Sequence, residues 1–513
     1  MKPSEFRSLA DVVEYQARLR PASVALVDED EVSYAQLSTR VDSVASALLA
    51  GGVTTGSRVA IMSKNSARFF ECLFGVLRAG AVCAPLNWRL SEVEILTILQ
   101  DFRPSVVLYE DEFAEVMRAS MEEYAAAYVA LEDAAFRTWL GAAVPVELPA
   151  TADLADTAVV MYTSGTTGRP KGVMLPHASF AKYCVEGPEV PHWWAMGPED
   201  VSAVAMPTFH AGGLEAALRS IFSGGKAIIM REFTPGLLLD VIETHRPSVV
   251  SLVPTALQMT LRQPRADLVD FRCIRTFFYG ASPIAADLLV DGLERMDCNF
   301  VQCYGMTETN STVVALPPED HDERLGERMR SAGRPIANVE LRVVDSEGND
   351  TRPHEVGEIL IHTAYCMTGY WERPDETAAA IDAEGWLHTG DAGYLDQDGY
   401  LYIHDRVKDM IVSGGENVYP AEVESVMFGH PDLAEVAVVG APDPVWGEAV
   451  NAFVVLEPGA VFDEQKVIAW TRRRLAGYKT PKRVMAVDSL PKNAAGKMLK
   501  HMLRQTADDP TAV

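Results

Sequence analysis

Residues 158–172 read AVVMYTSGTTGRPKG, an apolar run followed at once by a loop of small and hydroxyl-bearing residues. The run at 158–162 is short and bounded by turn-forming residues, which is typical of a buried strand. The loop offers backbone N–H groups and hydroxyls, and Lys171 adds a mobile cation, so it has the donors that a polyphosphate requires. The stretch therefore predicts a strand that ends in a phosphate-binding loop. The alternative is a flexible surface linker.

Two better-known nucleotide loops are excluded by the spacing. Pro170 stands where a Walker A loop has a second glycine before its lysine, and the chain contains no G-x-G-x-x-G dinucleotide turn. There is no G-x-S-x-G nucleophile elbow either, so a serine nucleophile is not expected. A phosphate loop at 163–172 has to belong to another kind of nucleotide site.

On either side of this stretch, short β-branched runs alternate with helical patterns. Ser33 can cap a helix with one apolar face, which ends at Gly51-Gly52. Further buried strands are expected at residues 58–62, 105–109, 227–230 and 248–253. This alternation predicts an α/β fold with doubly wound, largely parallel sheets.

The character of the chain changes after about residue 333. Residues 339–344, 357–362 and 399–404 look like strands joined by Gly/Asp turns, which predicts a β-rich subdomain. From residue 407 a shorter unit follows, with helices expected at 420–429 and 463–476 and strands at 434–440, 450–456 and 483–487. We therefore expect a large domain over residues 1–405 and a small, mobile α+β domain over residues 406–513.

Composition limits the classes of function. The chain has 513 residues, is 48% hydrophobic and carries a formal charge of −27, so it can form more than one domain and its acidic surface disfavours nucleic acid as a partner. The N-terminus has no apolar signal segment, and the longest apolar stretch, residues 69–85, contains Glu71 and Arg78, so no transmembrane segment is expected. Seven cysteines without a CxxC pair indicate reduced thiols, no structural zinc and a cytoplasmic location.

Six further short motifs follow in order along the chain. Each has a plain alternative, because single acids, charge clusters and lysines are usually solvated surface groups. A carboxylate and a hydroxyl on one tight turn, as in the second motif, suit Mg²⁺ beside phosphate oxygens, and the carboxylate of the third can accept from two vicinal hydroxyls. The motifs are GASP (280–283), YGMTE (304–308), TGD (389–391), DRVKD (405–409), SGGEN (413–417) and PKNAAGK (491–497).

These motifs, and the loop at 163–172 nearly letter for letter, resemble those of the acyl-adenylate-forming enzymes. That family includes acyl-CoA synthetases, peptide-synthetase adenylation domains and firefly luciferase. The resemblance implies that ATP and Mg²⁺ are used to join a carboxylic acid to AMP, with coenzyme A (CoA) as the next acceptor. One position departs from the family: Lys500 stands where an arginine is usual, and the replacement keeps the charge.

The resemblance also implies roles for individual residues. Lys497 is expected to be the adenylation lysine, and Lys408 the hinge about which the small domain turns. Thr307 is expected to contact phosphate and Glu308 to hold Mg²⁺. The other nucleotide-binding residues are expected to be Thr163, Ser164, Gly165, Thr166, Thr167, Gly168 and Lys171 at the phosphates, Gly280, Ala281, Ser282 and Tyr304 at the adenine, and Asp391 and Arg406 at the ribose and phosphates. Ser413, Gly414 and Gly415 are expected beside the pantetheine tunnel of CoA.

The acid is less narrowly predicted than the nucleotide. In the family, the position of His210 lies beside the substrate carboxylate, and amino-acid-activating members carry Asp there, so an amino acid is disfavoured. The alternative for His210 is a structural histidine. Short, medium, aromatic and sterol-derived acids all stay open. The acyl pocket is expected from Phe209, Ala211, Gly213, Val253 and Gly305, whose small or apolar side chains suit an apolar tail or ring.

The expected function is that of an acyl-CoA synthetase, which converts ATP, a carboxylic acid and CoA into acyl-CoA, AMP and pyrophosphate. Three other functions stay open: a ligase that loads a carrier protein, a luciferase-like oxygenase, and a non-catalytic nucleotide-binding homologue. The last would be expected to lose Lys497, Glu308 or Asp391, and all three are present. A peripheral membrane contact and a homodimer are compatible with the sequence, which decides neither.

Overall fold

The computed structural model describes residues 6–142, 153–163, 170–184, 191–282, 284–406, 409, 411–413, 416–418, 420–443, 446–475, 477–492 and 498–508. These residues form the α/β protein that the sequence predicts, and they divide into two compact units. Unit 1 comprises Met1–Glu340 and His362–Leu387, and unit 2 comprises Leu341–Ile361 and His388–Val513. Within the described ranges, no helix is both long and apolar enough to cross a bilayer.

This division does not coincide with the boundary expected at residue 406. The β-rich residues 341–361 and 388–405 were expected in the large domain and lie in unit 2. Their strands form one sheet among themselves, and a helix of the C-terminal part, α12 (Pro420–Phe428), contacts the last of them. A hinge near residue 406 concerns movement, so it stays a prediction.

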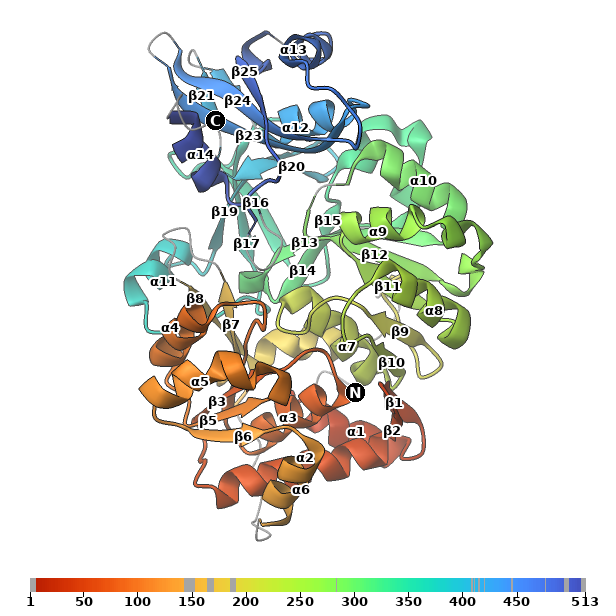
Figure 1. Cartoon of the computed structure of the whole chain (residues 1–513), viewed down its shortest axis with the longest axis vertical. Helices are drawn as coiled ribbons and strands as arrows, with labels where there is room; N and C mark the ends of the chain where they lie inside the picture. Colours follow the sequence, from red (N-terminus) through yellow and green to blue (C-terminus); the bar gives the residue numbers. More distant parts are fainter. Residues whose placement is uncertain are drawn as a thin grey trace. The chain divides into compact units, whose positions relative to one another are not determined.

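A nine-stranded sheet forms one part of unit 1 (Figure 1). Its order is β15-β14-β13-β12-β11-β9-β10-β1-β2, parallel from β1 to β13 and antiparallel at both edges. The strands are β1 (Val24–Val27), β2 (Glu31–Ser33), β9 (Val201–Val204), β10 (Lys226–Ile229), β11 (Val249–Leu252), β12 (Thr276–Gly280), β13 (Asn299–Met306), β14 (Ser311–Leu316) and β15 (Arg334–Pro335).

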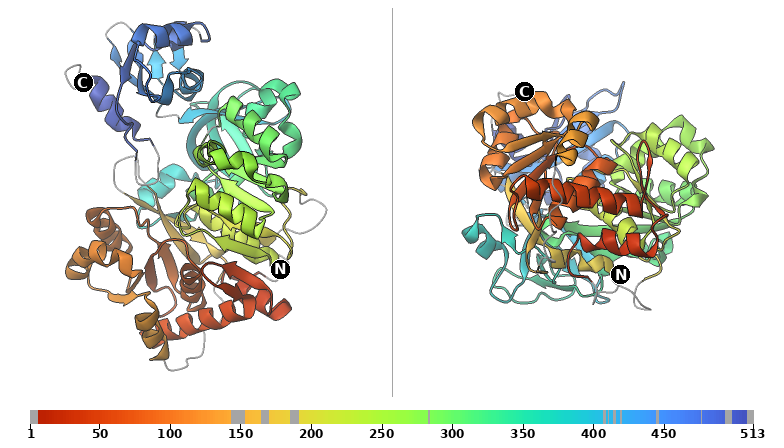
Figure 2. Two further views of the ribbon diagram at one scale, coloured as in Figure 1. Left: turned by 45° about the vertical axis from the view of Figure 1, so that its right-hand side comes forward. Right: turned by 90° about the horizontal axis from the view of Figure 1, so that it is seen from below.

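The chain reverses its direction across this sheet at β9. It passes from β9 through α7 (Ala211–Ser223) to β10 on one side, and then through α8 (Pro235–His245) to β11 on the other side of β9. α7 covers one face, whereas α8, α9 (Pro254–Leu261) and α10 (Ala286–Met296) cover the opposite face (Figure 2). A doubly wound sheet has its binding crevice at such a reversal, outside the carboxyl ends of two neighbouring strands, here β9 and β11.

A seven-stranded sheet in unit 1 follows the same logic, in the order β18-β8-β7-β4-β3-β5-β6. The chain passes from β3 through α3 (Ala67–Arg78) to β4, and then through α4 (Glu92–Phe102) back across β3 to β5, so the reversal lies between β3 and β5. The strands are β3 (Arg58–Met62), β4 (Val82–Pro85), β5 (Val106–Tyr109), β6 (Ala127–Ala130), β7 (Thr157–Thr163), β8 (Lys171–Pro176) and β18 (Gly369–Tyr370).

One apolar core joins the two sheets of unit 1. It contains side chains of α1 (Asp11–Leu19), α2 (Tyr34–Ala50), α3 and α7 together with inward residues of both sheets. α2 confirms the predicted helix: the Ser33 side chain accepts from the Gln36 N–H in a capping box, and Gly51 ends the helix. The other helices of the unit are α5 (Ala114–Glu123), α6 (Asp133–Gly141) and α11 (Pro374–Ala380).

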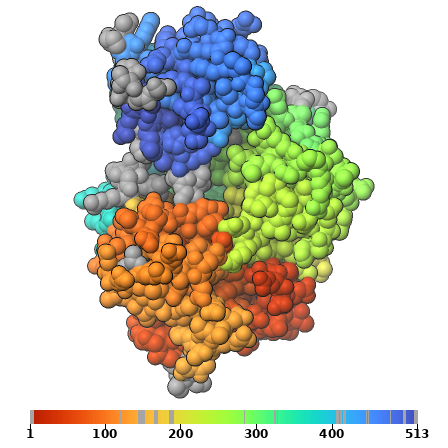
Figure 3. Space-filling view, viewed as in Figure 1, coloured from red at the N-terminus to blue at the C-terminus, as the bar shows by residue number. Residues whose placement is uncertain are grey.

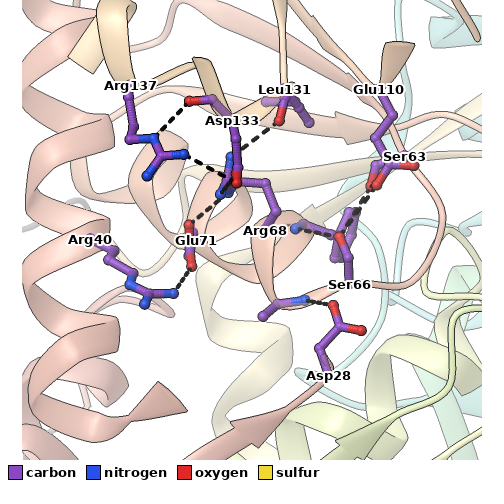
Figure 4. A network of polar contacts seen from close by, with 12 residues as sticks. Asp28, Arg40, Ser63, Ser66, Arg68, Glu71, Glu110, Leu131, Asp133 and Arg137 are labelled. Carbon is purple, nitrogen blue, oxygen red and sulfur yellow. Dashed lines mark hydrogen bonds and ion pairs between the residues drawn. The ribbon is translucent and has the colours of Figure 1, made fainter. Parts of the chain in front are cut away.

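α3 is buried along most of its length, and a network of polar contacts surrounds its amino-terminal half (Figure 4). The buried carboxylate of Glu71 accepts a hydrogen bond from Arg40 (2.7 Å). At the amino end of the helix, Asp28 accepts from the Ala67 N–H (3.0 Å), and Glu110 lies within hydrogen-bond reach of two serines. Carboxylates are favoured at this end because it carries the partial positive charge of the helix dipole.

Unit 2 confirms the predicted C-terminal elements. One sheet has the order β16-β17-β19-β20, and a second contains β21 to β25 with helices against it. The elements are β16 (Glu340–Val344), β17 (Gly357–His362), β19 (Leu387–Leu395), β20 (Leu401–Arg406), β21 (Ile411–Ser413), β22 (Glu416–Val418), α12, β23 (Leu433–Asp443), β24 (Gly447–Leu456), α13 (Glu464–Arg472), β25 (Arg483–Ala486) and α14 (Lys500–Asp508). The predicted helix at 463–476 is shorter than expected because α13 ends at Arg472.

Candidate nucleotide and acyl-binding site

Four neighbouring parallel strands of unit 1 carry predicted site residues at their carboxyl ends. β9 leads to His210, β11 to Val253, and β12 and β13 carry Gly280 and Tyr304. Gly280 pairs in register with Cys303, the residue before Tyr304. Because parallel strands place their carboxyl ends at one edge, these residues lie at and beside the crevice between β9 and β11.

Backbone strain marks two turns at this edge. Ala281, Asn310 and Ser311 have φ values of 65°, 51° and 75°, a left-handed conformation that costs about 1–3 kcal/mol for residues other than glycine and is typical of functional sites. Gly305 also needs to be glycine, because a Cβ there would lie 1.8 Å from the Ser311 carbonyl oxygen. The β13–β14 turn is therefore tightly determined, and it carries Thr307 and Glu308.

Glu308 is connected to the predicted phosphate-loop lysine through one aromatic side chain. The Tyr370 hydroxyl donates to Glu308 Oε1 (3.0 Å), and the Met367 N–H donates to the Glu308 carbonyl (2.7 Å). Lys171 Nζ lies 5.0 Å from the centroid of the Tyr370 ring and forms an ion pair with Glu376. Lys171 and Glu308, 137 positions apart in the sequence, thus contact one tyrosine, Lys171 at its ring and Glu308 at its hydroxyl.

The ends of the predicted phosphate loop are held together at its base. Thr163 closes β7 and Lys171 opens β8, and the two residues pair directly across the antiparallel ladder. β18 continues the sheet on the other side of β8, where Tyr370 pairs with Val173. Ser164, Gly165, Thr166, Thr167 and Gly168 lie outside the described residues.

The donor set at this turn fits a hydrated magnesium ion. Mg²⁺ is usually held by one or two carboxylates, several waters and the phosphates of a substrate. Glu308 supplies one carboxylate, 8% exposed and oriented by Tyr370, and Thr307 supplies a hydroxyl next to it. Among the described residues, no group of three or more His, Cys, Asp or Glu side chains could hold a metal ion by itself.

His210 lies at the amino end of α7, largely buried. Its ring centroid is 4.4 Å from that of Phe209. Burial, with a smaller contribution from the positive charge of Arg89, lowers the pKa of His210 to about 4. The imidazole is therefore neutral near pH 7, where it can donate a hydrogen bond to a carboxylate oxygen without forming an ion pair.

The histidines of unit 1 predict a pH dependence of stability. Burial lowers the pKa of His177, His210 and His321 to about 4 in each case, against about 6.5 in an unfolded chain. Between these values the unfolded chain binds more protons than the folded one. We therefore expect the free energy of unfolding to fall as the pH drops from 7 to 5, by about 1–2 kcal/mol for each such histidine.

The measurement compares denaturant unfolding of wild type and His177→Asn at pH 7 and pH 5. Asparagine can still accept from the Leu9 N–H, which donates to Nδ1 of His177 (3.1 Å). Since buried carboxyl groups titrate in the same range, the quantity of interest is the difference between the two proteins. A pH 7-to-5 loss as large in His177→Asn as in wild type would contradict the prediction.

Three of the five predicted acyl-pocket residues lie at the start of α7. Phe209 is buried with its ring at the edge of Trp88, at a centroid distance of 6.2 Å, and Ala211 is buried beside it at the first position of the helix. A Cβ on Gly213 would lie 2.1 Å from the Pro207 carbonyl oxygen, so this glycine admits the turn before the helix. Val253 and Gly305 lie at the ends of β11 and β13.

In unit 2, two further predicted nucleotide residues are neighbours. Asp391 on β19 pairs in register with Arg406 on β20. The Asp391 N–H donates to the Thr389 hydroxyl (3.0 Å), which in turn donates to the Ile359 carbonyl (2.8 Å). Gly390 between them has φ 69°. The TGD motif is thus a fixed bend that holds a buried carboxylate next to the strand of Arg406.

The remaining predicted residues are placed only by their surroundings. Ser413 ends β21 and pairs with Glu416 of β22. Gly414 and Gly415 lie outside the described residues. Lys408 and Lys497 are also outside the described residues. The segment 493–497 is closed at its base by a bridge between Lys492 and Met498.

Lys500, the position that departs from the family, has a structural partner. Its Nζ lies 2.9 Å from Glu424 on α12, and Glu424 also accepts from the Val438 N–H (2.7 Å). Four residues later, Arg504 pairs with Asp409 (2.8 Å). α14 is therefore fastened to unit 2 directly after the segment that contains Lys497, and a lysine makes this contact as an arginine could.

Several residues at the site were missed by the sequence analysis. Tyr370 sits on a two-residue strand without a pattern, so no sequence signal could have linked it to Glu308. Glu215 is a charged residue in the apolar run that opens α7, which is a signal, and it accepts from the Thr312 hydroxyl (3.1 Å) behind the β13–β14 turn. Fully buried Lys182 reaches the Asn310 carbonyl of the same turn. Trp88 and Asn65 follow the carboxyl ends of β4 and β3, a position that could have identified both.

Comparisons with known proteins cover nearly the whole chain. Residues 13–371 match the AMP-binding enzyme family, and residues 422–497 match the AMP-binding enzyme C-terminal domain. A fatty acid–[acyl-carrier-protein] ligase of Streptomyces coeruleorubidus is 40% identical over 98% of this chain and 96% of its own, and a feruloyl-CoA synthase of Amycolatopsis is 39% identical over 96% and 97%.

Solved structures give the same result. O-succinylbenzoate CoA synthetase of Bacillus subtilis is 32% identical in two complexes, one with an acyl-adenylate intermediate (TM-score 0.85, covering 96% of this chain and 97% of that one) and one with ATP and a magnesium ion (TM-score 0.84, 96% and 98%). The fold, the motif positions and these likenesses agree along both units, and the chain therefore belongs to the AMP-binding enzyme family.

Proposed function

We propose that this protein is an AMP-forming acyl-CoA synthetase, which activates an apolar carboxylic acid as its acyl-adenylate and transfers the acyl group to CoA. One observation carries the proposal: a cation of the predicted phosphate loop and a carboxylate suited to Mg²⁺ both contact the same tyrosine. Lys171, paired with Glu376, lies at the ring of Tyr370, and Glu308 accepts from the Tyr370 hydroxyl. A polyphosphate bound at this turn would meet both groups. The similar CoA ligases and the shared family give independent support.

In the first step, a carboxylate oxygen of the acid attacks the α-phosphate of ATP and pyrophosphate leaves. Lys171, Thr307 and the hydroxyl and N–H donors of residues 163–168 bind the phosphates, and Tyr304 with residues 280–282 lines the adenine. Glu308 holds Mg²⁺, which neutralises charge that develops on the phosphate oxygens. Because the transition state is anionic and crowded, catalysis rests on positioning and on charge.

The other nucleotide contacts in this proposal come from the motifs at 389–391, 405–409 and 491–497. Asp391 accepts from the ribose hydroxyls, and Arg406 assists at the ribose or phosphates. Lys497 stabilises the anionic transition state of the first step. The small domain at 406–513 then turns about Lys408 and presents the Ser413–Gly414–Gly415 turn to the pantetheine arm of CoA.

The acid is apolar in this proposal and is not an amino acid. A neutral, largely buried His210 cannot form the ion pair that an α-amino group requires, and it suits a hydrogen bond to the substrate carboxylate. Phe209 and Ala211 are buried and apolar. A cytoplasmic location, where ATP and CoA are available and cysteines stay reduced, is part of the same proposal.

A second acceptor is favoured by one specific observation: the relative with 40% identity is named as a ligase for an acyl-carrier protein.

The test supplies purified protein with ATP, Mg²⁺ and a panel of fatty and aromatic acids. CoA and a phosphopantetheinylated carrier protein are offered separately, and pyrophosphate and thioester are measured together. Acid-dependent release of pyrophosphate together with formation of acyl-CoA supports the proposal. If a thioester forms only on the carrier protein, the carrier protein is the acceptor in place of CoA. If no pyrophosphate is released in an acid-dependent way, the adenylate step is overturned.

A further inference from the structure

The chain reversals of the two sheets in unit 1 meet at one asparagine. Asn65 follows the carboxyl end of β3, beside the reversal between β3 and β5. Its side chain reaches the backbone after β9 and after β10, next to the reversal at β9. On the surface, the orange N-terminal residues and the green residues of the β11–α10 part adjoin along a seam of unit 1 (Figure 3). Asn65 lies inside, 2% exposed.

Every hydrogen-bonding position of the Asn65 amide is used. Nδ2 donates to the carbonyls of Met206 and Met230, both at 3.0 Å. Oδ1 accepts from the N–H of Thr208 (2.9 Å) and from its hydroxyl (3.1 Å). Two donors and two acceptor sites are the full capacity of an asparagine side chain. The amide pairs with the turn at 206–208 as a neighbouring peptide group would.

The other side of this turn is held by the start of α7. The His210 N–H donates to the Pro207 carbonyl (3.1 Å), and the His210 carbonyl accepts from the Leu214 N–H (3.0 Å). Gly213 leaves room for this, since a Cβ there would lie 2.1 Å from the Pro207 oxygen. With Asn65 on one side and α7 on the other, the backbone that leads into His210 has one arrangement.

Joining the two sheets does not depend on Asn65 alone. Glu110 after β5 pairs with Arg231 after β10 (2.8 Å), and Lys64 pairs with Glu232 (3.0 Å). These ion pairs cross the same seam through side chains and leave the turn at 206–208 untouched. Ser63 and Ser66, on either side of Asn65, are occupied with Glu110 (Figure 4). Among these side chains it is Asn65 that contacts the turn.

We propose that Asn65 is a positioning residue for the acid substrate: its amide fixes the turn at 206–208 so that His210 meets the substrate carboxylate, and Phe209 the acyl group, in one geometry. This inference rests on the proposed function for the role of His210. Asn65→Asp tests it, because an aspartate keeps the shape but turns an oxygen toward the Met206 and Met230 carbonyls. A misplacement of about 1 Å can cost on the order of 10²-fold in rate.

The matched control is Gln16, another buried side-chain amide of unit 1. Its Nε2 donates to the Phe222 carbonyl (2.6 Å) at the far end of α7. Gln16→Glu makes the same chemical change as Asn65→Asp, but away from His210. If the two amides had only a structural role, both variants would have a lower melting temperature, and the KM values for the acid and for ATP would be unchanged.

The experiment uses the whole chain and the acid that wild type turns over fastest. We expect Asn65→Asp to raise the KM for the acid at least about 10-fold with the KM for ATP within about 2-fold of wild type, whereas Gln16→Glu changes neither. His210→Ala combined with Asn65→Asp should cost no more than His210→Ala alone, because both act on the same contact. Unchanged acid KM in Asn65→Asp, or additive losses in the double variant, would overturn the inference while the proposed function stands.

A second measurement is independent of activity. Hydrogen exchange of the amides at 208–210 should be faster in Asn65→Asp than in wild type and unchanged in Gln16→Glu. Equal exchange rates in all three proteins would overturn the inference, whether or not an acid is turned over. If no acid in the panel were turned over, that result by itself would count only against the proposed function.

Discussion

Lys497→Ala is expected to slow acyl-adenylate formation by about 10²–10³-fold, the usual cost of removing one group that stabilises a developing anion. Thioester formation from preformed acyl-adenylate and CoA should stay near the wild-type rate, because in the proposed mechanism the lysine acts only while charge develops at the α-phosphate. The two half-reactions are measured separately, as pyrophosphate release and as thioester formed from synthetic acyl-adenylate.

Lys492→Ala is the matched control for this prediction. Lys492 belongs to the same motif and pairs with Glu435 (2.6 Å) at the base of the segment that contains Lys497. Its removal deletes a nearby positive charge without deleting the proposed catalytic group, so both half-reactions should change by less than about 5-fold, as for an exposed ion pair. If Lys497→Ala slowed both half-reactions equally, the lysine would have a general role in binding or folding.

Glu308→Gln is expected to reduce acyl-adenylate formation by about 10²-fold at low Mg²⁺ concentration, with a smaller loss as the Mg²⁺ concentration is raised. Glutamine has nearly the same shape and can still accept from the Tyr370 hydroxyl, which donates to Oε1 at 3.0 Å. What it lacks is the negative charge that attracts a hard cation. The measurement is the initial rate of acid-dependent pyrophosphate release as a function of Mg²⁺.

Tyr370→Phe separates the charge of Glu308 from its orientation. It leaves the carboxylate in place and removes one hydrogen bond, which is worth about 1 kcal/mol, so the rate should fall less than about 10-fold. If Glu308→Gln kept a rate within a few-fold of wild type, the metal would have to be held by other groups.

Local pattern in the sequence was enough to find most of the elements. β3 and β17 have the predicted ends, and the strand expected at 248–253 differs from β11 by one residue at each end. These segments are β-branched, buried and bounded by turns, so burial and propensity point to the same conclusion. Ser33 capped its helix as expected because the capping box is a contact within one turn.

Contacts between distant segments could not be found in this way. Glu308 and Tyr370 meet because β18 joins the edge of β8, and a strand of two residues has no period to detect. Asn65 and Thr208 meet because two chain reversals face each other, which depends on the strand order of both sheets. The return of residues 362–387 to unit 1, between two segments of unit 2, is likewise not visible in the composition, and the small mobile domain expected at 406–513 stays a prediction.

That return has a consequence for the order of folding during synthesis. β8 is paired with β7 on one side, and its other side is covered only when Gly369 and Tyr370 arrive, almost two hundred positions later. Until then a nascent chain exposes an open strand edge, which invites pairing with other chains. Unit 1 therefore cannot be completed before part of unit 2 has left the ribosome, and a shortened chain that ends before residue 369 should aggregate, whereas one that includes residue 387 contains every strand of the sheet.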